Sequence, residues 1–131
     1  MDEELKQIIS QSSFAVIAGS FIYAKVASLP ELGKHFMVSQ DKDEITVVTT
    51  QENFDALNLI ERNKDNYALV ALNVSVPFYS VGFLAAVSNA IAEAGMNILI
   101  VSTYSKDYIM VREDKLPEAK QTLLRLGFKE S

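Results

Sequence analysis

The pattern of apolar and polar positions is clearest in the second half of the chain. An apolar run predicts a strand over 69–76. From about Val81, apolar residues recur at spacings of three and four, which predicts a helix that Gly95 ends. Two further runs, at 97–103 and 108–111, predict two central strands that are joined by a tight turn.

A last helix is predicted from about Leu116. Pro117 fits its first turn, where the proline nitrogen needs no hydrogen bond, and Gly127 follows its end. From residue 69 the order is therefore β-α-β-β-α, one strand short of the ferredoxin-like βαββαβ pattern. The missing edge strand must be very short or must come from the N-terminal half.

The N-terminal half is rich in strand formers. An amphipathic helix is expected over 2–11, with acidic residues in its first turn. Residues 14–26 predict two strands with a break at Gly19, because glycine interrupts strands readily. Residues 35–40 and 44–50 predict a β-hairpin.

The stretch 51–66 is polar with few apolar positions, and loop, short helix and short strand all fit it. It is the best candidate for a boundary. We therefore expect a strand-rich N-terminal unit of residues 1–65, whose completeness the sequence leaves open, and a C-terminal unit of residues 66–131.

Composition excludes several classes of function. The formal net charge is −5 and the isoelectric point about 4.8, without the clustered Lys and Arg that nucleic-acid binding requires. The chain has no cysteine and does not begin with a signal peptide, and polar residues interrupt its apolar stretch at 81–101. We expect a cytoplasmic protein that binds neither nucleic acid nor membrane.

Catalytic and metal-binding motifs are also missing. His35 is the sole histidine, and without cysteines or a carboxylate cluster it cannot build a transition-metal site alone. The sequence has no Gly-x-Ser-x-Gly elbow and no phosphate-binding Gly-x-x-x-x-Gly-Lys loop. We therefore expect no metal, no cofactor and no enzymatic activity.

Ser80, Val81 and Gly82 lie where the predicted strand passes into its helix. The first backbone N–H groups of a helix have no helical partner and attract anions, so a ligand carboxylate would fit here. Gly82 permits close approach, and the Ser80 hydroxyl could bind a ligand or cap the helix. A capped helix that binds no ligand is the alternative.

Three segments resemble the second ACT domain of small tandem-ACT proteins, which are related to the ACT pairs of arginine sensors and aspartate kinases. They are Val76–Leu84, Ala92–Ile98 and Val101–Val111. The N-terminal half is similar to the partner domain, less sharply, because it lacks an obvious helix between its strands. The resemblance implies an α+β fold in which two ferredoxin-like ACT units pack into one body.

The resemblance also implies a ligand site and places Asp107 near it, where this carboxylate could neutralise a ligand ammonium. A solvated turn aspartate is the alternative. Ser102 and Thr103 could bind ligand polar atoms or their own backbone, and Phe78 could line the pocket or fill the core. The expected ligand-binding residues are Phe78, Ser80, Val81, Gly82, Ser102, Thr103 and Asp107.

The function that these expectations favour is allosteric sensing. An amino acid would bind at the site, and binding would act on a separate, unidentified partner protein. A homodimer or larger homo-oligomer is expected. The alternative is a dimerisation module without a small-molecule ligand, and an enzyme of unrecognised chemistry is a weaker possibility.

Overall fold

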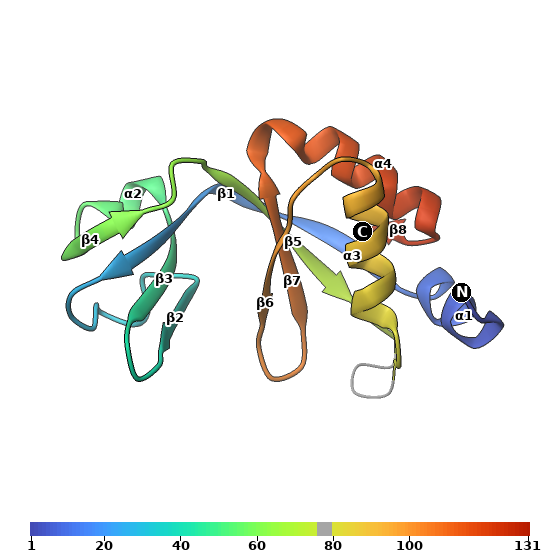
Figure 1. Cartoon of the computed structure of the whole chain (residues 1–131), viewed down its shortest axis with the longest axis horizontal. Coiled ribbons are helices and arrows are strands. Elements are labelled where there is room, and N and C mark those ends of the chain that lie inside the picture. Colours follow the sequence, from blue (N-terminus) through green and yellow to red (C-terminus); the bar gives the residue numbers. More distant parts are fainter. Residues whose placement is uncertain (76–79) are drawn as a thin grey trace. The chain divides into compact units, whose positions relative to one another are not determined.

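The computed structural model describes residues 1–75 and 80–131, and Figure 1 labels their helices and strands. The elements, in chain order, are α1 (Glu3–Ser10), β1 (Ser13–Val26), β2 (Met37–Gln40), β3 (Ile45–Thr50), α2 (Gln51–Phe54), β4 (Leu59–Arg62), β5 (Tyr67–Asn73), α3 (Phe83–Glu93), β6 (Leu99–Ser102), β7 (Asp107–Arg112), the 3₁₀ turn η1 (Glu113–Lys115), α4 (Leu116–Leu126) and β8 (Lys129–Glu130).

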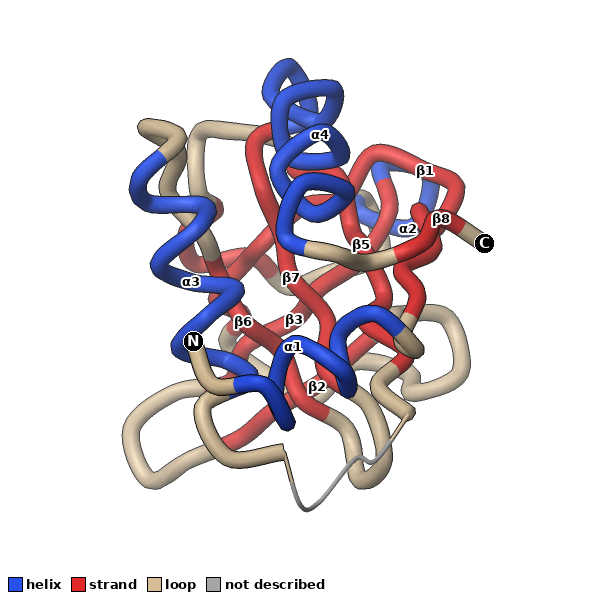
Figure 2. The backbone as a smooth tube through the Cα atoms, turned by 90° about the vertical axis from the view of Figure 1, so that its right-hand side faces the viewer, coloured by secondary structure: helices blue, strands red, loops and turns tan. Residues whose placement is uncertain are grey.

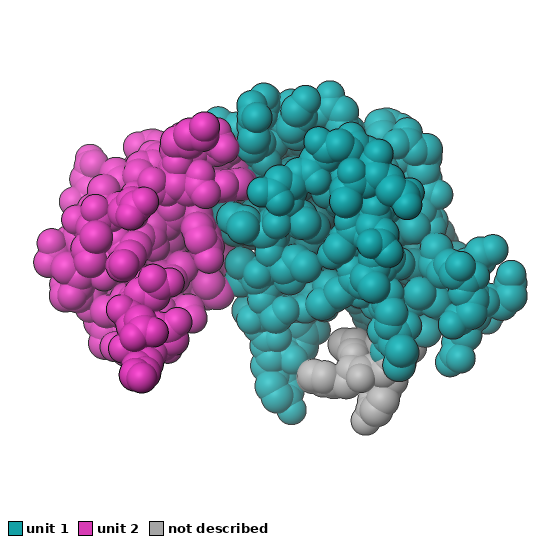
Figure 3. All heavy atoms as spheres, in the orientation of Figure 1, with its two compact units in different colours: residues 1–18, 68–131 teal, residues 19–67 magenta. Residues whose placement is uncertain are grey.

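The chain forms two compact units, which Figure 3 colours separately. The large unit consists of residues 1–18 and 68–131, and the small unit of residues 19–67. The sequence pattern placed the first eighteen residues with the N-terminal half, whereas their contacts group them with the C-terminal half. The physical reason is hydrophobic, because Leu5, Ile9 and Phe14 are buried in the core of the large unit.

The large unit has the ferredoxin-like order β5-α3-β6-β7-α4-β8 and an α+β fold. In its sheet, β1 pairs with β5, β5 with β7, and β7 with β6. The final strand β8 has only two residues, and it pairs in parallel with Ser13 and Phe14 of β1. The missing strand is thus very short, and β1 of the N-terminal half supplies the sheet position beside β5.

The core of the large unit lies on one face of this sheet. Ala68, Val70 and Leu72 of β5 alternate along their strand and are buried in this core, as are Ile109 and Val111 of β7. The helices α1, α3 and α4 bury their apolar faces against them; these helix residues are Leu5, Ile9, Phe83, Val87, Ile91, Ala119 and Leu123. In the described part of the chain, no helix is long and apolar enough to cross a membrane.

The predicted ends of α3, near Gly95, and of α4, at Gly127, are confirmed. The residues after α3 turn at Gly95, and α4 ends at Gly127, each with a positive φ that glycine adopts without strain. Pro117 lies in the first turn of α4. The helix α3 begins at Phe83, two residues later than the periodicity predicted.

Two strand predictions are wrong. Residues 13–26 form one strand, because Gly19 adopts φ +127° without interrupting the strand. The strand β6 is not central: it ends the strand order beside β7, and Ile100 is 41% exposed. An apolar run indicates that a strand is partly buried, but it does not show whether the strand has neighbours on both of its edges.

The small unit has the strand order β2-β3-β1-β4. The predicted hairpin is confirmed, with Gln40 opposite Ile45. The stretch 51–66, which fitted a loop, a short helix or a short strand, contains both the short helix α2 and the strand β4. The Arg62 guanidinium lies 5.5 Å from the ring centroid of Phe54, which links β4 to α2.

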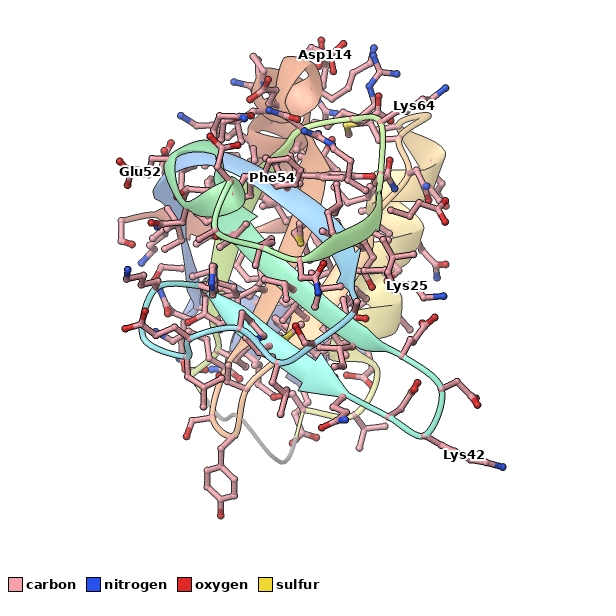
Figure 4. All side chains as sticks on the ribbon, turned by 90° about the vertical axis from the view of Figure 1, so that its left-hand side faces the viewer. Lys25, Lys42, Glu52, Phe54, Lys64 and Asp114 are labelled. Atoms are coloured by element: carbon pink, nitrogen blue, oxygen red, sulfur yellow. The ribbon has the colours of Figure 1, made fainter. Side chains whose placement is uncertain are left out.

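The hairpin turn between β2 and β3 is held by Asp41, whose Oδ1 accepts hydrogen bonds from the backbone N–H groups of Asp43 and Glu44, each at 2.8 Å. These bonds lower the pKa of Asp41 below its ordinary value. The side chain of Lys42 points away from the tip of this turn (Figure 4).

We predict that the turn loses this support in acid. The pKa of Asp41 is lower in the folded chain than in the unfolded chain, so its hydrogen bonds stabilise the turn fully above the ordinary pKa of aspartate. This stabilisation disappears as the pH falls through the pKa that Asp41 has in the folded chain. Asp41→Asn should make amide exchange of residues 43 and 44 less pH-dependent than in the wild type. Equal pH dependence of exchange in both proteins would contradict this.

Candidate functional site

A pocket of about 560 Å³ lies in the large unit, between the start of α3 and the β6–β7 hairpin. Figure 1 shows the start of α3 and the turn between β6 and β7 at the same end of this unit. The pocket brings together six of the seven residues expected at the site; these are Ser80, Val81, Gly82, Ser102, Thr103 and Asp107. Phe78 lies outside the described residues.

The start of α3 presents backbone donors to this pocket. Gly82 is the N-cap residue, and its φ of +84° is one that glycine adopts readily. Phe83 N–H donates to Ser80 O at 3.1 Å and Ala86 N–H donates to Gly82 O at 2.9 Å. The intervening N–H groups, of Leu84 and Ala85, belong to the first turn and have no carbonyl of the helix to donate to.

The N-cap residue of α3, Gly82, makes no side-chain capping hydrogen bond. The sequence left open whether Ser80 caps the helix, and the structure gives the N-cap position to Gly82 instead. The partial positive charge of the helix start lies at the pocket, because Gly82, Phe83 and Leu84 line it. Such a helix start can accept the anionic group of a ligand.

The β6–β7 hairpin provides a carboxylate. Asp107 is half-buried and lies opposite Ser102 in the ladder of the two strands. The Ser102 hydroxyl donates a hydrogen bond of 2.5 Å to Asp107 Oδ1. Ser102 thereby orients the carboxylate, and Asp107 can still accept a further hydrogen bond because each carboxylate oxygen has two lone pairs.

Thr103 closes the hairpin loop. Its backbone N–H donates to Lys106 O at 2.9 Å, and its hydroxyl donates to the same oxygen at 3.3 Å. The Thr103 side chain thus satisfies local backbone, which is one of the two roles that the sequence allowed. The turn residues Tyr104 and Ser105 also line the pocket.

Sequence reasoning missed about half of the pocket lining. The missed residues are Val74, Phe83, Leu84, Ala85, Tyr104, Ser105 and Lys106. Most are chain neighbours of expected residues, so treating the helix start and the hairpin turn as whole segments could have found them. Val74 and Leu84 add apolar surface, and Lys106 adds a cation.

The arrangement has the groups that a small zwitterion would need. Amide donors at a helix start fit a carboxylate, and an oriented carboxylate fits an ammonium group. Within residues 1–75 and 80–131, no three His, Cys, Asp or Glu residues come together as a metal site would require.

Comparisons with solved structures show the same fold elsewhere. A protein of unknown function from Vibrio cholerae, described as a possible transport protein, is 22% identical, with a TM-score of 0.80 over 95% of this chain and 97% of that one. The regulatory subunit of aspartate kinase from Thermus thermophilus is 13% identical, with a TM-score of 0.60 over 86% and 95%.

Aspartate kinase from Clostridium acetobutylicum is 13% identical, with a TM-score of 0.66 over 88% of this chain. The present chain corresponds to only 34% of that kinase. No curated protein sequence matches the chain. Residues 62–125 match the family model of the ACT domain, and no catalytic family is indicated. The comparisons therefore show an ACT domain over residues 62–125.

Proposed function

We propose that this protein binds an α-amino acid, or a metabolite with an α-amino acid group, and regulates a partner protein allosterically. The observation that carries the proposal is the pocket itself, which joins a helix start with a glycine N-cap to an oriented carboxylate. The ACT domain match and the fold shared with aspartate kinase regulatory subunits support a regulatory role.

The ligand carboxylate would accept hydrogen bonds from the Leu84 and Ala85 amides at the start of α3. The ligand ammonium would donate to Asp107, whose position Ser102 fixes. Val74 and Leu84 would contact the aliphatic part of the ligand. Binding would act on a partner only if it favours one conformation of the large unit over another.

A second function, assembly with another protein or another copy of this chain, is favoured by two exposed side chains at the pocket. Val81 is 91% exposed and Tyr104 is 87% exposed, and both line the pocket. Large apolar side chains this exposed are common at interaction surfaces. A tight oligomer that no amino acid stabilises would favour this second function.

A thermal-shift screen against the twenty amino acids and common nucleotides tests the proposal. An amino acid at a hundredfold excess over its dissociation constant should stabilise the protein by about 2.7 kcal/mol. Asp107→Asn keeps the size of the side chain and removes its charge, so it should abolish most of the shift. No shift across the panel, or an equal shift in Asp107→Asn, would contradict the proposed site.

A further inference from the structure

The N-terminal helix α1 contacts both chain segments that lead into the pocket. Figures 1 and 2 show α1 beside the end of α3 that begins at Phe83. None of the residues of α1 lines the pocket itself. Any influence of α1 on a ligand must therefore pass through the residues that it holds.

The first contact is made just before the undescribed residues. The buried Ser12 hydroxyl, which follows α1, accepts a hydrogen bond of 3.1 Å from Ser75 N–H and donates one of 2.6 Å to Ile8 O. The Ser75 hydroxyl donates to the same Ile8 oxygen at 3.4 Å. Since Val74 lines the pocket, these bonds fix the pocket wall to the C-terminal end of α1.

The second contact is made at the start of α3. A Cβ on Gly82 would lie 3.5 Å from Leu5 Cδ2, so the Leu5 side chain packs directly on the N-cap residue. Val81 and four residues of α1 and its N-cap line a hollow of about 90 Å³; these are Asp2, Glu4, Leu5 and Ile8. The residues that would bind the ligand carboxylate are thus supported by α1.

The helix α1 depends on tertiary contacts for its helical structure. The helix has eight residues, and helices this short are not stable in isolation. Tertiary contacts of Leu5 and Ile9, which are 7% and 0% exposed, together with Ser12 hold it in place. Its outer side consists of exposed polar residues; these are Glu3, Glu4, Lys6, Gln7 and Ser10.

We infer that docking of α1 and occupancy of the pocket are thermodynamically coupled, so that α1 is the element that reports ligand binding. The inference rests on the proposed function. A ligand that holds the start of α3 in its present geometry stabilises the surface on which Leu5 and Ser12 dock. By linkage, an undocked α1 lowers ligand affinity by the same factor.

Hydrogen exchange of the full chain tests the coupling. The probe is a mixture of the twenty amino acids, and the readout is amide exchange of residues 6–12 compared with residues 120–126 of α4. We expect the mixture to slow exchange in α1 about fivefold more than in α4. A thermal shift without this difference would overturn the coupling and leave the pocket assignment intact, whereas no thermal shift would refute the proposed function itself.

Ser12→Ala, with Ser10→Ala as the matched control, tests the reverse direction. Both serines donate to a backbone carbonyl of α1, but only Ser12 also accepts from Ser75. Ser12→Ala should weaken the affinity for the active amino acid of the mixture about fivefold at a temperature where the variant is folded, and Ser10→Ala should not. Equal affinities in the two variants would overturn the inference, and the wild-type exchange experiment decides it if Ser12→Ala does not fold.

Discussion

Gly82→Asp should lower the affinity for an amino acid ligand by at least about 100-fold, which corresponds to roughly 2.7 kcal/mol. The substitution places a carboxylate at the N-cap of α3, where the Leu84 and Ala85 amides would otherwise bind the carboxylate of the ligand. Two carboxylates cannot share these donors, and their charges repel each other at close range. Isothermal titration with the amino acid found in the thermal screen measures the effect.

Gly82→Asn is the matched control for this variant. The residue has φ +84°, and asparagine and aspartate tolerate this conformation better than other non-glycine residues, so both variants carry similar strain. A Cβ there would meet Leu5 at 3.5 Å, an ordinary contact distance. Affinities of the two variants within threefold of each other, about 0.65 kcal/mol, would show that the helix start does not bind the ligand carboxylate.

Much of the large unit could be predicted because its signals are local. The spacing of apolar residues in α3 and α4, with Gly95 and Gly127 near their ends, depends on residues within a few turns of one another. Of the pocket residues, Ser80, Val81 and Gly82 follow from such a local signal, whereas the resemblance to ACT domains placed Asp107 near the site. The start of a helix at Ser80–Gly82 and a hairpin whose second strand starts at Asp107 line the same pocket in this fold.

The remaining features depend on contacts that leave no local pattern. Ser12 and Ser75 are 63 residues apart, and each would fit a solvated loop equally well. The hydrogen bond from Ser102 to Asp107 requires the register of β6 and β7, which follows from the length of the loop and not from the residue types. The exposure of Ile100, 41% beside 5% for Val101, depends on which face of β6 the rest of the unit covers, and the apolar run itself does not encode that face.

The division of β1 between the units shows the same limit. Its apolar residues predict a strand, but they do not show which sheet neighbours it joins. Gly19 marks the division, since the large unit contains residues up to 18 and the small unit starts at 19. The sequence marked Gly19 only as a break between two strands and placed its expected boundary between units at residues 65 and 66.

Phe14→Ala should destabilise the large unit by about 3–5 kcal/mol, the usual cost of removing a buried aromatic ring. Phe14 is 0% exposed, belongs to the same core cluster as Phe83, Val87 and Leu123, and pairs with β8 through its backbone. A loss of this size is a large part of the stability of an ordinary domain. Urea denaturation, followed by circular dichroism, measures it.

Phe36→Ala is the control for this second variant, because Phe36 is half-buried, lies in the small unit and packs edge-on against Phe21 at a centroid distance of 6.2 Å. Phe36→Ala should lower the free energy of unfolding by less than Phe14→Ala does, and it should leave amino acid binding intact. If Phe14→Ala cost under about 1 kcal/mol, the start of β1 would not belong to the core of the ACT-containing unit. If the loss is as large as expected, an isolated fragment of residues 66–131 should not fold, because it lacks the three side chains that residues 1–18 bury in that core; these are Leu5, Ile9 and Phe14.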